Sequence, residues 1–453
     1  MGSDDANPGD ALAAFIAAAC VPIDGSWHAS GTLAAADAIL AAHPEVAGAS
    51  IHAAAILGDD VGVRRFLALD LDQASAQGGP RGWDPLTHLC FSNYLRLDPA
   101  RSAGFVRAAE ALLDAGASAN TGFYAQDHDP PERQSAIYGA AGVARHAALT
   151  RLLLERDADP NDGETPYHTP ETVHDDALRV LVESDKLTPG SMTTMLHRKL
   201  DWHHREAVAY LLEHRADPNR LSRWGRRALH HALGRTNDLP FFELLLDHGA
   251  DPALPSLEGK TAFAIAARMG RADVLTLFER RAFVAELAGD DAFFAACARA
   301  DEAQARALMA GEPGLVARLQ AEDGAVLADF AGAGNTEGVR LLLDLGFDVG
   351  SRTDRGGARG DSALHVAVWR ERLATVDLLL ERGVALEAVN GRGETALSLA
   401  VRAQVEESDW TPHRTLDIVA TLLGAGADVA TVRSFPSGSA AADELLRSYG
   451  RRA

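Results

Sequence analysis

The sequence has few cysteines, few aromatic residues and no long apolar run. Its three cysteines, Cys20, Cys90 and Cys297, are odd in number and far apart, which argues against a disulfide framework and against a zinc site. No apolar run reaches the ~18 residues that a membrane-spanning helix needs. These absences disfavour a disulfide-rich secreted protein and a membrane protein with helical spans. We expect the cysteines to be small core residues in a reducing compartment, the cytoplasm.

Basic residues are also fewer than acidic residues. Lys and Arg number 43 against 64 Asp and Glu, so the formal net charge is −21. Nucleic acids and anionic membrane surfaces repel such a protein, and we expect neither as a partner. An apolar run at residues 11–21 loosely resembles a lipoprotein signal, but Asp4, Asp5 and Asp10 precede it without any Lys or Arg. Because the n-region of a signal is positive, we interpret this run as a helix.

One pattern is abundant. Residues 362–383 (SALHVAVWRERLATVDLLLERG) predict two amphipathic helices of about two turns each, joined by a polar corner. Helices this short are marginal without packed neighbours. The second-helix ending, Leu-rich and then Gly-Ala-Asp or a variant, recurs at 112–120, 152–161, 211–219, 244–252, 341–349 and 422–429. Arg215 and Gly249, which close two successive helices, are 34 residues apart, and Gly249 and Gly346 are 97 apart, or three units of about 32. The chain is therefore expected to be a stack of helix pairs.

First-helix signatures lie in phase with these endings: TPYH (165–168), RALH (227–230), TAFA (261–264), SALH (362–365) and TALS (395–398). The pattern resembles the ankyrin repeat, a unit of about 33 residues with T-P-L-H where the first helix begins and Gly-Ala-Asp where the second ends. The resemblance implies an all-α solenoid of about ten or eleven helix pairs with short β-hairpin fingers. It also implies a scaffold that binds other proteins.

The predicted organisation has three parts. Residues 1–49 form a tail and capping helices, residues 50–433 the solenoid, and residues 434–453 a C-terminal capping helix. Insertions at 94–104 and 405–415 and a long finger at 118–135 interrupt the solenoid. In the fourth repeat Pro170 should interrupt the first helix, and repeats seven and eight (258–324) lack the Gly-Ala-Asp ending.

Seventeen histidines suggest metal binding, but their positions favour a structural role. The His position of T-P-L-H holds His52, His168, His197, His230 and His365, and the resemblance implies that each ring hydrogen-bonds within its turn. No His lies near a second His, Cys or carboxylate at the spacing of a known zinc motif. We expect neither a metal nor another cofactor.

In ankyrin arrays the variable residues after the Ala pair of the first helix face a concave groove, together with the finger tips. Five of the last six repeats have an arginine there, the Arg row: Arg235, Arg268, Arg299, Arg370 and Arg402. Guanidinium groups pair with carboxylates, phosphates and sulfates, so the Arg row predicts an acidic protein segment or a small anionic ligand as partner. Alternatively the row is solvated surface, since Arg favours helices and its stem covers apolar surface.

Indole rings strengthen the binding hypothesis because they often anchor partners. The full candidate binding set adds Ser92, Asn93, Tyr124, Arg198, Asp201, Trp202, Trp224 and Trp369 to the Arg row. We expect the chain to be a monomer.

A second hypothesis is an enzyme or small-ligand receptor with a pocket in repeats two to six, where the sequence departs most from the repeat. Glu171, Asp201 and His203 would supply acid/base chemistry if they converge. The sequence does not show convergence, so both hypotheses stay open, and the resemblance favours the scaffold.

Overall fold

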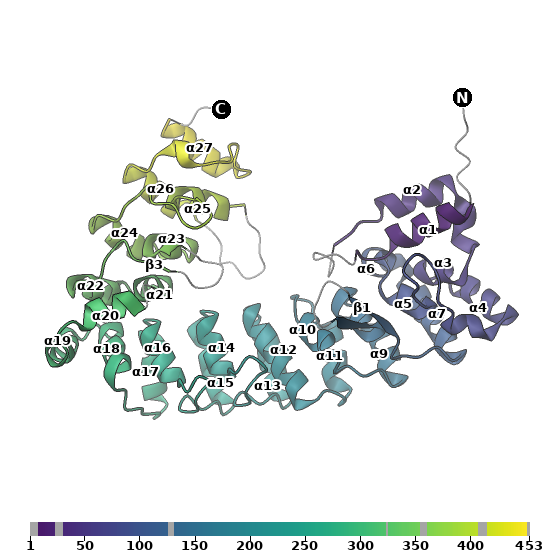
Figure 1. Ribbon diagram of the computed structural model, residues 1–453, viewed down its shortest axis with the longest axis horizontal. Coiled ribbons are helices and arrows are strands. Elements are labelled where there is room, and N and C mark those ends of the chain that lie inside the picture. Colours follow the sequence, from purple (N-terminus) through teal and green to yellow (C-terminus); the bar gives the residue numbers. More distant parts are fainter. Residues whose placement is uncertain are drawn as a thin grey trace. The chain divides into compact units, whose positions relative to one another are not determined.

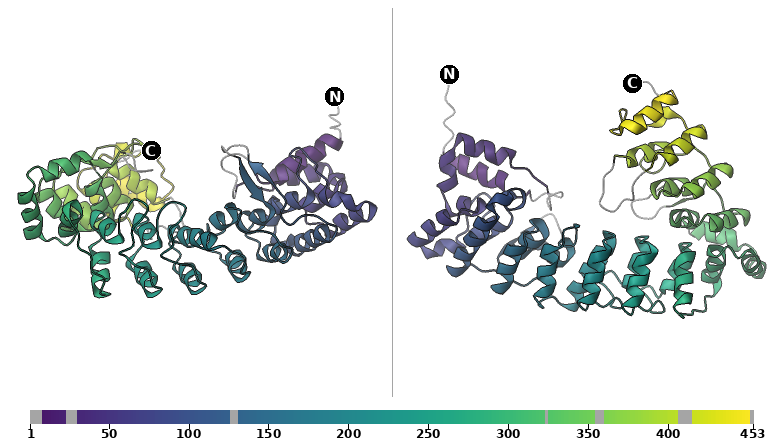
Figure 2. Two further views of the ribbon diagram at one scale, coloured as in Figure 1. Left: turned by 60° about the horizontal axis from the view of Figure 1, so that its bottom comes forward. Right: turned by 180° about the vertical axis from the view of Figure 1, so that it is seen from behind.

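The computed structural model describes residues 8–22, 30–125, 131–322, 325–353, 360–405 and 415–450. These residues form two compact units, unit 1 (Met1–Arg223) and unit 2 (Trp224–Ala453). Figure 1 labels their elements, and Figure 2 gives two further views.

Unit 1 consists mainly of short helices. In chain order its elements are α1 (Pro8–Ala19), α2 (Ala34–Ala42), η1 (Pro44–Gly48), α3 (Ile51–Ile56), α4 (Asp60–Leu69), η2 (Leu71–Ser75), α5 (Pro85–Cys90), α6 (Asn93–Leu97), η3 (Pro99–Arg101), α7 (Ser102–Asp114), β1 (Gly122–Ala125), β2 (Glu132–Ser135), α8 (Ala136–Tyr138), η4 (Gly139–Val143), α9 (Ala147–Glu155), α10 (Glu164–His168), α11 (Asp176–Glu183), α12 (Pro189–Asp201) and α13 (Arg205–Glu213).

Unit 2 continues the pattern. It contains α14 (Ala228–Gly234), α15 (Leu239–Asp247), α16 (Ala262–Arg268), α17 (Ala272–Arg280), α18 (Gly289–Ala298), α19 (Glu302–Gly311), α20 (Leu315–Glu322), α21 (Val326–Ala333), α22 (Thr336–Asp344), β3 (Arg352–Thr353), β4 (Asp361–Ser362), α23 (Ala363–Trp369), α24 (Leu373–Glu381), α25 (Ala396–Ala403), α26 (Asp417–Gly424), η6 (Val429–Thr431) and α27 (Ala440–Ser448).

The helices of each unit stand in pairs beside one another (Figures 1 and 2). Within unit 1, first helices pack on first helices (α3 on α5, α10 on α12) and second helices on second helices (α4 on α7, α9 on α11). Within unit 2, α23 packs on α21 and α25, and α24 on α22 and α26. This stacking buries apolar faces that no single short pair buries alone. The all-α repeat architecture is confirmed.

Side-chain N-caps start several first helices, and many helices end at a residue with the left-handed backbone conformation. The side chains of Ser50, Thr261 and Thr395 accept the N–H three residues on, which satisfies a donor with no helical partner. At the corners where many repeats have glycine, nine other residues of the described ranges have φ between 49° and 71°: Arg145, Asp157, Asp185, His203, Arg215, Thr236, Ala282, Ala300 and Glu371.

The cysteines are core residues, as predicted. Cys20, Cys90 and Cys297 are free and buried. Burial raises the pKa of Cys20 to about 12, because a thiolate is costly away from water. All three are therefore neutral thiols packed among apolar side chains.

The long finger at 118–135 is a hairpin that packs on the second repeat. Strands β1 and β2 pair antiparallel, and the ring of Phe123 stacks on Trp83 at a centroid distance of 4.2 Å. The next residue, Tyr124, is 58% exposed, as strand alternation requires. A second hairpin pairs β3 with β4. The insertion at 94–104 forms most of α6, η3 and the start of α7, whereas the insertion at 405–415 lies, apart from its two ends, outside the described residues.

Repeats seven to nine stack unevenly. Helix α21 contacts α16, and α18 contacts α22. The Asn335 side chain accepts the Gly338 N–H at 2.9 Å, and its Nδ2 donates to the carbonyls of Gly270 (2.8 Å) and Ala298 (2.7 Å). One amide therefore connects three repeats.

Candidate functional site

The first-helix histidines form hydrogen bonds within and between repeats. In His365, Nδ1 accepts the Ser362 N–H at 3.3 Å, and Nε2 donates to the Glu394 carbonyl of the next repeat at 3.0 Å. In His230, Nδ1 accepts the Arg227 N–H at 3.3 Å. Burial lowers the pKa of His230 to about 4, so the ring is neutral and free to accept. The structural role predicted for these two histidines is confirmed.

We expect His365→Ala to lower the free energy of unfolding by about 1–3 kcal/mol, because the Ser362 N–H and the Glu394 carbonyl lose their partner. Urea unfolding followed by circular dichroism measures the change. His43→Ala is the control, since the His43 side chain is 34% exposed and its Nδ1 lies 3.4 Å from Glu45. Stoichiometric zinc or iron that is lost with His365 would contradict the structural role.

The first helix of the fourth repeat is broken, as Pro170 predicts. Helix α10 ends at His168, and the irregular segment that follows cannot offer the regular helical N–H donors to every carbonyl. Side chains donate to the carbonyls around the break at 2.5 to 3.3 Å: Thr169 to Thr165, Arg198 to Tyr167, Arg145 to Glu171 and Lys199 to Thr172. Helix α12 of the next repeat thus contributes two of the four donors.

Two of the three proposed acid/base residues converge on Arg198. Its guanidinium forms ion pairs with both Glu171 and Asp201 and lies 4.2 Å above the ring of Tyr167. The Arg198 side chain is 14% and the Asp201 side chain 6% exposed. The enzyme hypothesis requires a substrate between Glu171 and Asp201, but the Arg198 guanidinium lies there instead.

The imidazole partner of Glu171 is His168, with His168 Nδ1 2.7 Å from a Glu171 oxygen. His168 Nε2 lies 3.2 Å from Glu164. Burial alone would lower the pKa of His168, but the hydrogen bonds to Glu164 and Glu171 outweigh it and raise that pKa above its usual value. His203 instead forms the corner after α12, with φ 49°. The three proposed residues are thus divided between an ion network and a turn.

A second buried cation supports the same break. Lys199 is fully buried, and its Nζ lies 2.6 Å from Asp175 and 3.3 Å from His204 Nδ1. Burial lowers the pKa of Lys199, while Asp175 opposes that change. Lys199 and Arg198 together donate hydrogen bonds to backbone carbonyls at and after the end of α10. We interpret the polar residues of repeats four and five as a support for this segment.

Ser92 and Asn93 lie inside the protein, which corrects their predicted place on the groove surface. Each is 1% exposed. Ser92 Oγ donates to the Ile56 carbonyl at 2.6 Å, and Asn93 accepts from Arg96 at 3.2 Å. The physical reason is the insertion, whose helix α6 starts at Asn93: Ser92 faces the first repeat, and Asn93 lies beside Gly31 near the N-terminus.

The Arg row occupies two different helix positions in unit 2. Arg268 and Arg402 lie in the last turns of α16 and α25, whereas Arg235, Arg299 and Arg370 are C-cap residues. A cation is favoured at either position because the C-terminal end of a helix is negative. Helix stability alone therefore accounts for part of the pattern.

Carboxylates of the chain itself partly neutralise the Arg row. Ion pairs connect Arg268 to Asp291 (3.7 Å), Arg299 to Glu279 (2.6 Å) and Arg402 to Glu394 (2.7 Å). The Arg402 guanidinium also lies 5.3 Å from the ring centre of Trp369, which brings two predicted site residues together on α25 and α23. The row is therefore not one uniform positive strip.

A segment rich in arginine includes the last residues of unit 1 and the first residues of unit 2. Between Asp217 and Asp238 the sequence has five arginines and no acidic residue. Arg226 and Arg235 are exposed, and Arg226 Nη1 lies 3.0 Å from where a Cβ of Gly234 would stand. Trp224 is 41% exposed. We call Trp224, Arg226, Arg235 and Arg268 the basic corner. Arg226 does not occupy a variable position of the repeat and was therefore not predicted, although the run of arginines without acidic residues is visible in the sequence.

Trp202 is half-buried at the C-cap of α12 in unit 1. On the finger after Trp224, Leu257 is 78% exposed, and its N–H donates to the Gly225 carbonyl at 2.7 Å. Unit 2 thus exposes two large apolar side chains on neighbouring fingers.

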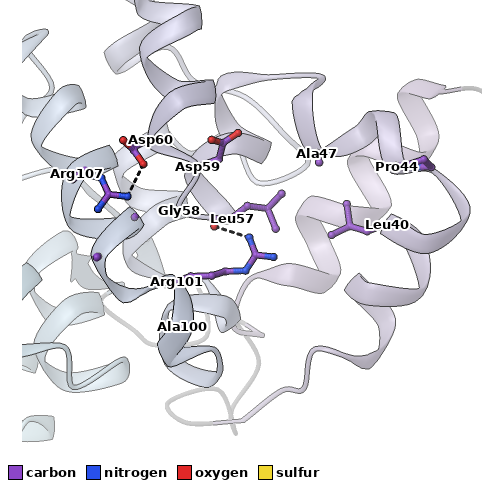
Figure 3. A pocket seen from close by; sticks show the side chains of 12 residues that line it. Leu40, Pro44, Ala47, Leu57, Gly58, Asp59, Asp60, Ala100, Arg101 and Arg107 are labelled. Carbon is purple, nitrogen blue, oxygen red and sulfur yellow. Dashed lines mark hydrogen bonds and ion pairs between the residues drawn. The ribbon is translucent and has the colours of Figure 1, made fainter.

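An open cavity of about 570 Å³ lies in unit 1 between the N-terminal cap and the first two repeats. Figure 3 shows its lining side chains, with the guanidinium of Arg101 directed into the space between Leu57 and Leu40. Ala100, Arg101, Ala103, Gly104 and Arg107 of its lining belong to the second repeat, but the predicted acid/base residues Glu171, Asp201 and His203 do not line it.

Among the described residues, no group of three or more His, Cys, Asp or Glu side chains is placed to hold a metal ion. Over the same ranges no helix is both long and apolar enough to cross a membrane.

Comparisons with known proteins match the repeat pattern. A family model described as ankyrin repeats (3 copies) matches residues 196–286 and 327–432. The ankyrin repeat domain-containing protein SAT10 of Stachybotrys chartarum is 36% identical over 83 residues, which are 18% of this chain and 4% of that protein. The crystal structure of the ankyrin repeat domain of Bcl-3, a member of the IkappaB protein family, has 21% identity and a TM-score of 0.26 and covers 56% of this chain and 97% of that chain. The helix pairs, their caps and the family match together show that the chain contains ankyrin repeats, matched over residues 196–286 and 327–432.

Proposed function

We propose that this ankyrin scaffold binds an acidic segment of a partner protein along the first-helix side of unit 2, starting at the basic corner. Ankyrin repeats indicate a protein-interaction scaffold. The observation that carries the finer proposal is the run of five arginines without an acidic residue between Asp217 and Asp238, in a chain of net charge −21. Farther along, Arg370 and the pair of Trp369 and Arg402 extend the surface.

Charge and apolar surface support this partner. A positive surface on a negative protein attracts an acidic segment locally and repels it elsewhere, which orients the encounter. The exposed indole of Trp224 and the exposed Leu257 offer apolar contacts beside the charges. The acid/base alternative is not part of the proposal, because Arg198 holds Glu171 and Asp201.

We expect Arg235→Glu with Arg268→Glu to weaken the binding of a fluorescein-labelled polyglutamate peptide by about a hundredfold or more, since each charge-assisted contact contributes about 1.5–3 kcal/mol. Fluorescence anisotropy measures the affinity. The control is Arg306→Glu with Arg340→Glu, which makes the same change of net charge on α19 and α22, where the side chains are 54% and 41% exposed.

Salt gives a second readout. Affinity should fall steeply as salt rises, because the Debye length shrinks from about 10 Å at 0.1 M to about 3 Å at 1 M. If the first double variant and salt leave the affinity intact, the basic corner is only solvated surface. An equal loss in the control would show that net charge alone determines binding.

A further inference from the structure

The cavity of unit 1 is built by two departures from the ankyrin repeat. Its walls come from the N-terminal cap (Leu40, Pro44 and Ala47), from the turn between α3 and α4, and from the insertion in the second repeat. Neither the cap nor the insertion is needed for a regular helix pair. At about 570 Å³ the cavity is within the range of small-molecule sites.

Specific contacts hold the insertion and the cap around the cavity. The Tyr94 hydroxyl donates to Asp37 of α2 at 2.6 Å, and Arg96 donates to the Ser30 carbonyl at 2.7 Å. On the opposite side α7 approaches the turn so closely that a Cβ at Gly104 would be 2.4 Å from the Gly58 carbonyl oxygen. The walls are therefore fixed by hydrogen bonds and by a backbone contact that only glycine allows.

Arg101 supplies a hydrogen-bond donor in the cavity. Its Nε donates to Asp98 at 2.9 Å and its Nη1 to the Leu57 carbonyl at 3.1 Å, and the guanidinium lies 5.2 Å from the ring centre of Tyr94. Nη2 has no hydrogen-bond partner among the residues that the structure describes. The two bonds thus orient the guanidinium and leave one edge toward the cavity.

Asp59 supplies an acceptor in the same cavity. Its Oδ1 caps α4 by accepting the Gly62 N–H at 3.0 Å, and Oδ2 makes no further hydrogen bond within the described ranges. Asp60, also in the lining, is neutralised by Arg107 at 2.9 Å. With Asp98 included, the three carboxylates outnumber the two guanidinium groups, so a simple anion is disfavoured.

We propose that the cavity binds a zwitterionic apolar amino acid or short apolar peptide. The ligand carboxylate would pair with Arg101 Nη2 and its ammonium group with Asp59 Oδ2. Its side chain would pack on Leu40, Pro44 and Leu57. Such a ligand carries no net charge, offers one acceptor and one donor, and fills an apolar space, as this lining requires. The site is separate from the basic corner, which lies in unit 2.

Isothermal titration calorimetry on the full chain tests the proposal with four probes. Leucine and leucyl-leucine distinguish a free amino acid from a peptide, and at least one of them should bind. N-acetylleucine, which lacks the ammonium group, and isoamylamine, which lacks the carboxylate, should bind at least tenfold more weakly. Failure of both leucine and leucyl-leucine to bind at millimolar concentration would overturn the proposal, as would equal binding of all four probes.

Two variants locate the site. Asp59→Asn retains a good N-cap and removes the charge, so we expect at least a tenfold loss of affinity for the better zwitterion with little change of stability. Arg101→Lys should weaken binding similarly, because the ammonium group of Lys lacks the guanidinium fork. The matched control is Asp70→Asn, a capping aspartate of η2 outside the cavity. Unchanged affinity in Asp59→Asn, or an equal loss in Asp70→Asn, would contradict this site.

Discussion

Arg198→Ala should lower the free energy of unfolding by about 3–5 kcal/mol, because it leaves two largely buried carboxylates without their common partner. Glu171 and Asp201 both pair with this guanidinium. The variant also removes the donor to the Tyr167 carbonyl at the end of α10. Urea unfolding at neutral pH, followed by circular dichroism, measures the loss.

The control for Arg198 is Arg151→Ala. The Arg151 side chain is 55% exposed and lies 3.8 Å from Glu183, and an exposed pair of this kind contributes less than about 1 kcal/mol. A loss below that value in Arg198→Ala would show that the network is solvated and does not support the broken helix.

Acidification adds an independent check on the same variant. Burial would raise the pKa of Glu171, but His168 and Arg198 together hold it below its usual value. A carboxylate with a depressed pKa contributes stability above its unfolded pKa, and this contribution is lost as the pH falls through the folded pKa. The difference in the free energy of unfolding between wild type and Arg198→Ala should therefore become smaller toward low pH. If this difference stays constant with pH, the charge of Glu171 is not the cause of the loss.

Asn335→Asp should destabilise unit 2 by about 2–4 kcal/mol, although Asp caps helices as well as Asn. The carboxylate still accepts the Gly338 N–H, but it cannot donate to the carbonyls of Gly270 and Ala298, which would then face a negative charge. Thermal and urea unfolding measure the loss. Asp301→Asn makes the reverse exchange at the N-cap of α19 and should change stability by less than about 0.5 kcal/mol.

If Asn335→Asp also changes the free energy of unfolding by less than about 0.5 kcal/mol, the amide does not hold the three repeats together. A loss as large in Asp301→Asn would assign the effect to capping in general.

Local signals predicted the fold well because the repeat is itself a local unit. The Leu-rich endings and the T-P-L-H positions fall on second and first helices, and Pro170 ends α10 where its ring requires. Arg198 and Asp201 are three residues apart on one helix, so their ion pair was also within reach of sequence reasoning.

Contacts that depend on the placement of neighbouring repeats were not predictable. Asn335 reads as an ordinary corner residue, and only the uneven stacking of α16, α18 and α21 brings Gly270 to its amide. The insertion at 94–104 was visible in the sequence, but the sequence did not show that it would bury Ser92. The carboxylates that pair with the Arg row are on adjacent elements, so their distance from the arginines follows from stacking alone.

The left-handed corners have a consequence for how the protein tolerates change. At nine corners a side-chain-bearing residue adopts φ between 49° and 71°, a conformation that costs about 1–2 kcal/mol in any residue with a Cβ. Glycine would avoid this cost, at an entropic cost of roughly 0.5–1 kcal/mol. Natural variation has thus left small improvements unused at many independent positions, and they add because distant corners share no contacts. Glycine substitutions at these corners would therefore add stability that can offset destabilising surface changes, including those that create a new binding specificity.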